Sequence, residues 1–160
     1  MLNIEILCVG KMNAKWFAEG TEEYLKRLSR YAHITVTEVK DEKTPDNASS
    51  KEEQEILDTE GKRLLERIHK DDYVIVLAIN GKRFSSPELS GRLEKLQTMG
   101  KSSLTMVIGG SPGLSGMVMQ RADEAWSFSD LTFPHQLMRV ILLEQVYRAY
   151  RIMNHEPYHK

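Results

Sequence analysis

The sequence predicts a single α/β domain (residues 1–160) in which helices cover both faces of a parallel β-sheet. Strand-like and helix-like segments alternate along the whole chain, which is typical of parallel strands joined by helical connections. Two of the strand-like segments, 73–79 and 104–108, are mainly apolar and contain no charged residue. Such runs indicate strands that are buried on both faces. A length of 160 residues is also usual for one domain.

The first half of the chain contains two expected strands and two expected helices. An apolar stretch followed by glycine predicts a strand over residues 2–9. Aromatic and leucine residues at near-helical spacing predict a helix over 14–31, and alternating apolar residues predict a strand over 34–39. Ser50 and Glu53 match a capping box, so we expect the second helix to begin there.

The second half continues the alternation. Asn80-Gly81 predicts a turn after the strand over 73–79. Ser86-Pro87 combines a capping serine with a proline suited to the first helical position, which predicts a helix that ends at Gly100. The remaining expected elements are a strand over 104–108, a short helix over 116–122, a strand over 125–129 and a final helix from Pro134 to about Met153.

Composition excludes several classes of function. Apolar residues make up 41% and charged residues 28% of the sequence, which excludes a disordered or collagen-like chain. The net charge of −1 argues against a general nucleic-acid or membrane-surface binder. No apolar run approaches the roughly 18 residues of a membrane helix, and Cys8 is the only cysteine, so a multi-cysteine metal site is excluded. We therefore expect a cytoplasmic protein without a membrane or metal partner.

Charge is distributed unevenly along the chain. Residues 1–72 carry 12 basic and 16 acidic side chains, whereas residues 73–160 carry 10 and 7. Arg139, Arg148 and Arg151 all lie in the final predicted helix. We therefore expect an anionic partner to bind the C-terminal half. The alternative interpretation is that each of these arginines is an ordinary solvated charge without a partner.

Three loops are candidates for a ligand site, because ligands bind at the carboxyl ends of strands in doubly wound sheets. These loops follow Ile79, Ile108 and the last predicted strand, where residues 130–135 lie. The second has three glycines in five residues (109–113), more than a strand-to-helix turn needs. Glycines let a ligand approach the backbone closely. No G-x-G-x-x-G motif follows a strand, so a dinucleotide is not expected.

The glycine-rich loop also matches G-x-S-x-G, the nucleophile elbow of serine hydrolases. Ser111, Asp130 and His135 follow in the order of a hydrolase triad. Pro112 argues against this function, because it has no N–H for the oxyanion hole, and one missing donor raises the barrier by about 2.7–4 kcal/mol. A serine hydrolase using Ser111 is the alternative function, and a non-catalytic nucleotide- or RNA-binding module is a third.

Long motifs in the sequence resemble the RlmH family, small SPOUT-class methyltransferases that act on large-subunit ribosomal RNA. The motifs are LCVGK at 7–11, VIGGSPGL at 107–114, SFSDLTFPH at 127–135, Arg139, EQVYRA at 144–149 and YHK at 158–160. They are long and correctly ordered, and they span the whole chain.

The resemblance implies a fold, a reaction and an assembly. The fold is SPOUT-like, with a C-terminal trefoil knot, and the protein is a homodimer. The reaction transfers a methyl group from S-adenosyl-L-methionine to N3 of a pseudouridine in the helix 69 loop of 23S rRNA, on the assembled 70S ribosome. Because knots are nearly absent from proteins, the residues alone would predict an unknotted domain.

The resemblance also implies site residues, which come from the three loops, the last helix and the tail. The implied cofactor-binding residues are Leu77, Gly109, Phe128, Ser129, Asp130, Leu131, Thr132 and Phe133. His159 is the candidate catalytic base, since imidazole titrates near neutral pH and a mobile tail can close over a cofactor. Tyr158 is expected to hydrogen-bond or stack on the target base. Arg139, Arg148 and Arg151 are candidates for binding RNA phosphates, and a disordered terminus is the alternative for the tail.

Overall fold

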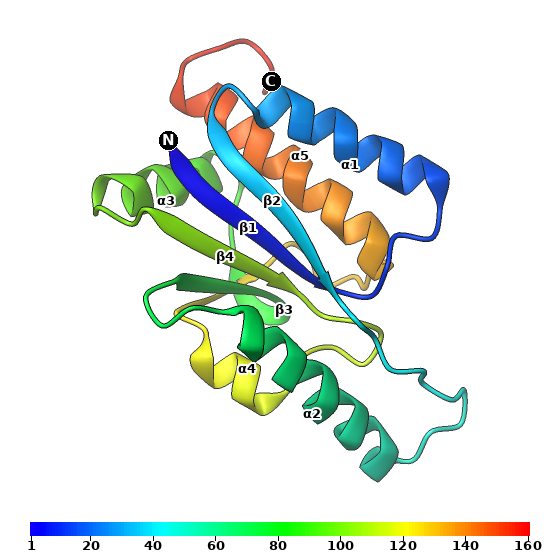
Figure 1. Cartoon of the computed structure of the whole chain (residues 1–160). Helices are drawn as coiled ribbons and strands as arrows, with labels where there is room; N and C mark the ends of the chain where they lie inside the picture. Colours follow the sequence, from blue (N-terminus) through cyan, green and yellow to red (C-terminus); the bar gives the residue numbers. More distant parts are fainter.

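Five parallel strands form one sheet between two layers of helices in the computed structural model, which describes residues 1–160 (Figure 1). The strand order is β2-β1-β4-β3-β5. The elements in chain order are β1 (Leu2–Val9), α1 (Lys15–Leu28), β2 (Ala32–Val39), α2 (Ser50–Arg67), β3 (Tyr73–Arg83), α3 (Ser86–Thr98), β4 (Ser103–Ile108), α4 (Gly116–Arg121), β5 (Glu124–Ser127) and α5 (His135–Met153). The predicted α/β class is confirmed, whereas the trefoil knot stays a prediction. No helix has both the length and the hydropathy needed to cross a membrane.

The side chains of the sheet divide between two apolar clusters. In β1, Ile4 and Ile6 belong to a cluster of 19 buried residues that includes residues of α1, α3 and α5. Leu7 and Val9 belong to a cluster of eight that includes residues of α2 and α4. Figure 1 shows the same division, with α1, α3 and α5 on one side of the sheet and α2 and α4 on the other. Each fully buried aliphatic side chain stabilises the fold by about 1.5–3 kcal/mol, so both layers are held by burial.

The serine caps of α2 and α3 lie one residue earlier than predicted. Ser49 caps α2 in place of Ser50, and Ser85 caps α3 in place of Ser86. In each case the serine Oγ accepts a hydrogen bond, 3.2 Å long, from the amide three residues later. Both sites contain two adjacent serines, and in both the glutamate that completes the capping box is three residues after the first serine.

The turn predicted at Asn80-Gly81 is wrong, because β3 continues through these residues. The strand is irregular there: Leu77 and Lys82 both pair with Trp126 of β5, so the four residues between them leave the ladder. A Cβ on Gly81 would lie 2.6 Å from the carbonyl carbon of Ala125. Only glycine fits so close to another strand. Gly81 therefore allows β3 and β5 to pack closely. Strand β5 itself is shorter than the predicted 125–129.

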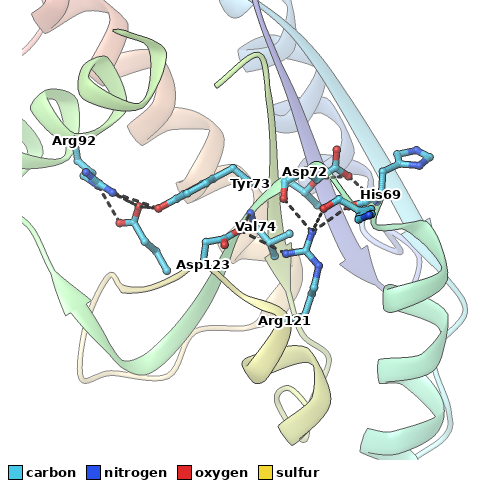
Figure 2. Close-up of polar contacts among 10 residues, drawn as sticks. His69, Asp72, Tyr73, Val74, Arg92, Arg121 and Asp123 are labelled. Atoms are coloured by element: carbon cyan, nitrogen blue, oxygen red, sulfur yellow. Dashed lines mark hydrogen bonds and ion pairs between the residues drawn. The ribbon is translucent and has the colours of Figure 1, made fainter. Parts of the chain in front are cut away.

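Hydrogen bonds hold Glu124, the first residue of β5. Its carboxylate accepts bonds from Arg92 Nη2 (2.5 Å), Tyr73 Oη (2.6 Å) and Trp126 Nε1 (3.0 Å). Figure 2 shows Arg92 and Tyr73 converging from α3 and β3. Burial alone would raise the pKa of Glu124, but the bonds from these three side chains lower it. Burial, followed by contact with the same carboxylate, raises the pKa of Tyr73 to about 12. The network therefore holds an ionised carboxylate and a neutral phenol.

A second set of bonds holds the chain just before β5. The Val74 amide donates to Asp123 Oδ2 and the Asp123 amide donates to the Val74 carbonyl, both at 2.8 Å. Arg121 Nη2 donates to the carbonyls of His69 and Asp72, both at 3.0 Å. Figure 2 shows Arg121 extending toward the loop between α2 and β3. The edge strand is thus held at its first residue and at the residues just before it.

Arg139 of α5 is a buried arginine that joins three elements. Its side chain is 1% exposed. Nη2 donates to the carbonyls of Val9 (3.1 Å) and Gly10 (2.6 Å), and Nη1 donates to the Glu38 carboxylate (2.6 Å). The guanidinium therefore ties the carboxyl ends of β1 and β2 to the last helix. Because Arg139 is buried and engaged with these partners, it would bind RNA phosphates only after leaving them, and its phosphate-binding role stays a prediction.

We expect Arg139→Met to lower the free energy of unfolding by about 3 kcal/mol, because it leaves two buried carbonyls and a carboxylate without their donor. Urea denaturation followed by circular dichroism measures this change. Arg30→Met is the control, since the Arg30 side chain is 68% exposed, and it should change stability by no more than about 0.5 kcal/mol. Similar losses in both variants would contradict the structural role of Arg139.

Candidate functional site

A cavity of about 510 Å³ lies where β4 and β5 end and where β3 leaves the ladder after Leu77. Its wall comes mainly from residues 77–80, 108–114 and 126–133, and about half of the lining residues are hydrophobic. Small-molecule sites typically have volumes of about 300–1,000 Å³ and a largely apolar wall with a few polar groups. The three segments that the sequence analysis selected, because each follows an expected strand, therefore meet at one cavity.

Seven of the eight predicted cofactor-binding residues line this cavity, and one does not. Those that line it are Leu77, Gly109, Phe128, Ser129, Leu131, Thr132 and Phe133. Asp130 forms an ion pair with Arg83 of β3 instead. Both partners of this pair are more than half exposed, so it contributes little to stability. The cofactor-binding role of Asp130 therefore stays a prediction.

The glycine loop, residues 109–113, forms one side of the cavity. A Cβ on Gly109 would overlap the Gly113 carbonyl, with 2.8 Å to its carbon, so no side chain fits there. Gly113 has a φ of +96°, which favours glycine. The Gly113 amide donates to the Gly110 carbonyl at 3.1 Å, whereas the amides of Gly109 and Ser111 have no partner within the chain. The loop therefore presents free backbone donors at the cavity.

The loop after β5 also leaves backbone donors unpaired. The Leu131 amide donates to Ser129 Oγ at 2.9 Å, but the amides of Thr132 and Phe133 have no partner within the chain. Both of these residues line the cavity. A polar ligand with acceptor atoms would satisfy such groups.

His135, the first residue of α5, is part of the cavity wall. Burial lowers its pKa below the ordinary value of 6.5; the charge of Arg139 lowers it further, and Asp41 opposes the shift. The imidazole is therefore neutral at neutral pH. In the sequence, His135 lies at the end of the candidate ligand loop 130–135 and in the order of a hydrolase triad.

Other wall residues carried no signal in the sequence. Met119 and Met138 reach the cavity from α4 and α5, and Trp126 reaches it from β5. Their positions depend on how these elements pack on the sheet, and a local sequence motif does not predict that packing. Ile79 and Asn80 also line the cavity, and these two residues are at the strand end that was selected from the sequence.

The residues of the hydrolase alternative do not form a triad. Ser111 and His135 both line the cavity, but no hydrogen bond joins them. Asp130 is paired with Arg83, and Pro112 has no N–H to offer an oxyanion. A triad requires each of these contacts. No group of three or more His, Cys, Asp or Glu side chains is placed to hold a metal ion.

The C-terminal tail packs on α5 away from the cavity. Tyr158 Oη donates to the Glu144 carboxylate at 3.1 Å, and Arg148 Nη1 lies 3.1 Å from His159 Nδ1. Because arginine can only donate, Nδ1 is the acceptor and Nε2 carries the proton of the neutral ring. Arg148 follows His135 by 13 residues on α5, which is about 20 Å along the helix. Figure 1 accordingly shows the C-terminus beside the end of α1, at the opposite end of the sheet from the loop after β4.

Arg148 and Arg151 are both engaged in ion pairs. Arg148 pairs with Glu144 and Arg151 with Glu156, each at 2.5 Å, and Arg151 also donates to the Pro157 carbonyl at 2.8 Å. These contacts hold the tail on the helix. The two arginines would bind phosphates only after exchanging these partners, so their role in RNA binding stays a prediction.

We expect His135 to titrate below pH 6.5, with Arg139 and Asp41 as the charged groups that face it. Because its pKa is lowered in the folded protein, protonation favours the unfolded state, and stability falls as the pH drops through and below about 6.5. His135→Gln should flatten this decline between about pH 7 and pH 5. Proton NMR of the imidazole gives the pKa, and urea denaturation at the two pH values gives the stability. A pKa at or above 6.5 would contradict the burial argument.

The sequence matches known methyltransferases over nearly its whole length. Residues 2–159 match the family described as "Predicted SPOUT methyltransferase". The chain is 55% identical over 159 residues to the ribosomal RNA large subunit methyltransferase H of Listeria monocytogenes, covering 99% of this chain and 100% of that protein. It is 52% identical over 160 residues to the protein of the same name from Desulfitobacterium hafniense, covering 100% of both.

The fold is similar to that of a probable methylase family protein from Haemophilus influenzae. The two structures superpose with a TM-score of 0.57, at 10% sequence identity, covering 98% of this chain and 70% of the other. At this identity the likeness concerns the fold alone.

Proposed function

The chain belongs to the RlmH family of SPOUT methyltransferases, and from this premise we propose that it methylates N3 of a pseudouridine in 23S rRNA. The methyl donor is S-adenosyl-L-methionine, and the target lies in the helix 69 loop of the assembled 70S ribosome in the cytoplasm. One observation carries the proposal: the motifs at 107–114 and 127–135, which resemble those of the family, contribute most of the wall of one cavity.

The cavity suits S-adenosyl-L-methionine in size and in chemistry. Its volume of about 510 Å³ is that of a small-molecule site. Leu77, Leu114 and Phe128 supply apolar surface, and the unpaired amides of Gly109 and of the loop after β5 supply donors for polar atoms. Gly109 leaves the backbone bare where a side chain would overlap Gly113. When bound, the cofactor supplies an electrophilic methyl group.

The protein's own part in the reaction is to align the target base and to remove the N3 proton. Alignment of the reacting atoms lowers the barrier to methyl transfer, and a base that titrates near neutral pH assists loss of the proton. We assign that base to His159, with Tyr158 holding the target base beside it. Because Arg148 occupies Nδ1 of His159, the tail has to leave its packed position on α5 before the ring accepts a proton.

We further propose that the protein acts as a homodimer in which each tail serves the cavity of its partner. The tail lies about 20 Å along α5 from the cavity of its own chain. Ile79 and Leu131, at the cavity, are 54% and 69% exposed, and large exposed apolar side chains that gather at one place favour a protein contact.

The proposed substrate is the ribosome rather than free RNA. A net charge of −1 gives little general attraction to a polyanion, so affinity has to come from shape and from a few contacts. Arg148 and Arg151 are the proposed phosphate contacts once the tail has moved.

The reaction is tested by incubating the protein with radiolabelled S-adenosyl-L-methionine and ribosomes from a strain that lacks the gene. Label is expected in 23S rRNA as N3-methylpseudouridine. If calorimetry detects cofactor binding but no label is transferred, the target is wrong. If the cofactor does not bind, the proposed reaction is wrong.

Gly109→Arg should raise the dissociation constant for S-adenosyl-L-methionine at least about 100-fold, because its side chain has no space beside Gly113. Isothermal titration calorimetry measures this constant. The matched control is Gly116→Arg, since a Cβ on Gly116 has no neighbour within 4 Å, and it should bind normally. Normal binding by Gly109→Arg would rule out this cavity as the cofactor site.

Deleting residues 158–160 should lower kcat at least about 100-fold, the usual contribution of a general base, and change cofactor affinity less than about threefold. Mixing this variant with Gly109→Arg tests which cavity the tail serves. A mixed dimer has one intact cavity, and only the Gly109→Arg chain supplies a tail. Recovered activity is expected if the tail acts on the partner's cavity, whereas no recovery would mean that it acts on its own.

A further inference from the structure

Glu60 of α2 is a buried carboxylate with one unused oxygen. The residue is 3% exposed. Its Oε2 accepts a hydrogen bond from the Glu42 amide at 3.0 Å, but its Oε1 is buried without any partner. Buried carboxylate oxygens are normally hydrogen bonded, because an unpaired buried charge is unfavourable.

The carboxylate of Glu60 faces the glycine loop. A Cβ on Gly110 would lie 3.3 Å from Oε1 and 3.6 Å from Oε2. The next residue, Gly61, packs on the residue that caps α4: a Cβ there would overlap Ser115 Oγ and lie 3.0 Å from Ser115 Cβ. One turn of α2 thus contacts both the glycine loop and the start of α4 that follows it.

Neighbouring charges leave Glu60 without a compensating partner. Burial raises its pKa, the Glu42 amide lowers it, Asp41 raises it and Arg63 lowers it. Arg63 is engaged elsewhere, with the Glu42 carboxylate and the Lys40 carbonyl. An ionised Glu60 therefore destabilises the folded protein relative to a neutral side chain of the same shape.

We propose that Glu60 is a positioning residue for the glycine loop, and that its Oε1 accepts a hydrogen bond from the Ser111 amide when the cofactor is bound. Oε1 is a buried acceptor without a partner, and the amide of Ser111, next to Gly110, is a donor without a partner. A movement of the loop that brings this amide to Oε1 would satisfy both. The inference rests on the proposed function, since it assigns Glu60 to the binding of S-adenosyl-L-methionine.

The first test compares Glu60→Gln with Glu55→Gln, an exposed position on the same helix. Glutamine keeps the shape of Glu60 but carries an NH2 donor in place of one oxygen, so it cannot accept a hydrogen bond at both the Oε1 and the Oε2 positions. For Glu60→Gln, calorimetry should give a dissociation constant about tenfold higher, with kcat at saturating cofactor within about threefold of the wild type. Its melting temperature without cofactor should equal or exceed that of the wild type. Glu55→Gln should match the wild type in all three.

Gly110→Ala provides a second, independent variant. Its Cβ would lie 3.2 Å from Val9 Cγ1 and 3.3 Å from Glu60 Oε1, which pushes the loop away from the carboxylate. Because Gly110→Ala and Glu60→Gln disturb the same contact, their effects on cofactor affinity should not add in the double variant.

Three results would overturn the role of Glu60. The first is wild-type cofactor affinity in Glu60→Gln, and the second is full additivity with Gly110→Ala. The third is a melting temperature that falls together with affinity, which indicates a merely structural residue. Failure of both the wild type and Glu55→Gln to bind S-adenosyl-L-methionine would instead overturn the proposed function, and with it this assignment.

Discussion

The pairing of Trp126 with two residues of the same neighbouring strand shapes the ligand site. Because Leu77 and Lys82 both pair with this one residue, the chain between them has to leave the ladder, and part of it lines the cavity. The arrangement depends on a glycine at position 81, where β3 and β5 come too close for a side chain. It also depends on a firmly held edge strand, which the bonds of Arg92 and Tyr73 to Glu124 provide. Edge strands have only one neighbour, so such anchoring has to come from side chains.

Buried charged groups connect the remaining parts of the site. Arg139 ties the ends of β1 and β2 to the helix that carries His135 and Met138 into the cavity wall. Glu60 lies beneath the glycine loop on the other side of the sheet, with an oxygen left unpaired. The arginine has found its partners within the fold, whereas the glutamate has not. Arg139 therefore stabilises the fold, whereas Glu60 has an acceptor free for a change in the glycine loop when a ligand binds.

The sequence predicted those features that depend on short stretches of chain. The apolar runs at 73–79 and 104–108 marked buried strands, and the rule that ligands bind at strand ends selected the three loops that form the cavity. The failures have two causes. Adjacent serines made the helix caps ambiguous by one residue, and Asn80-Gly81 has the composition of a turn although it packs against a strand. The burial of Arg139 and the reach of Met119 depend on tertiary packing, which no local pattern contains.

The connectivity of the sheet has a consequence for how the protein is made. The central pair of strands, β1 and β4, aligns Cys8 with Ile108, and the bond from Arg139 to the Val9 carbonyl spans 130 residues. Contacts between such distant segments form slowly, because a long loop has to close first. During synthesis β1 therefore remains without its inner neighbour until β4 has emerged, and α5 arrives later still. Competence to bind a ligand is thus acquired at the last stage of folding, and until then one edge of β1 is exposed to pairing with other chains.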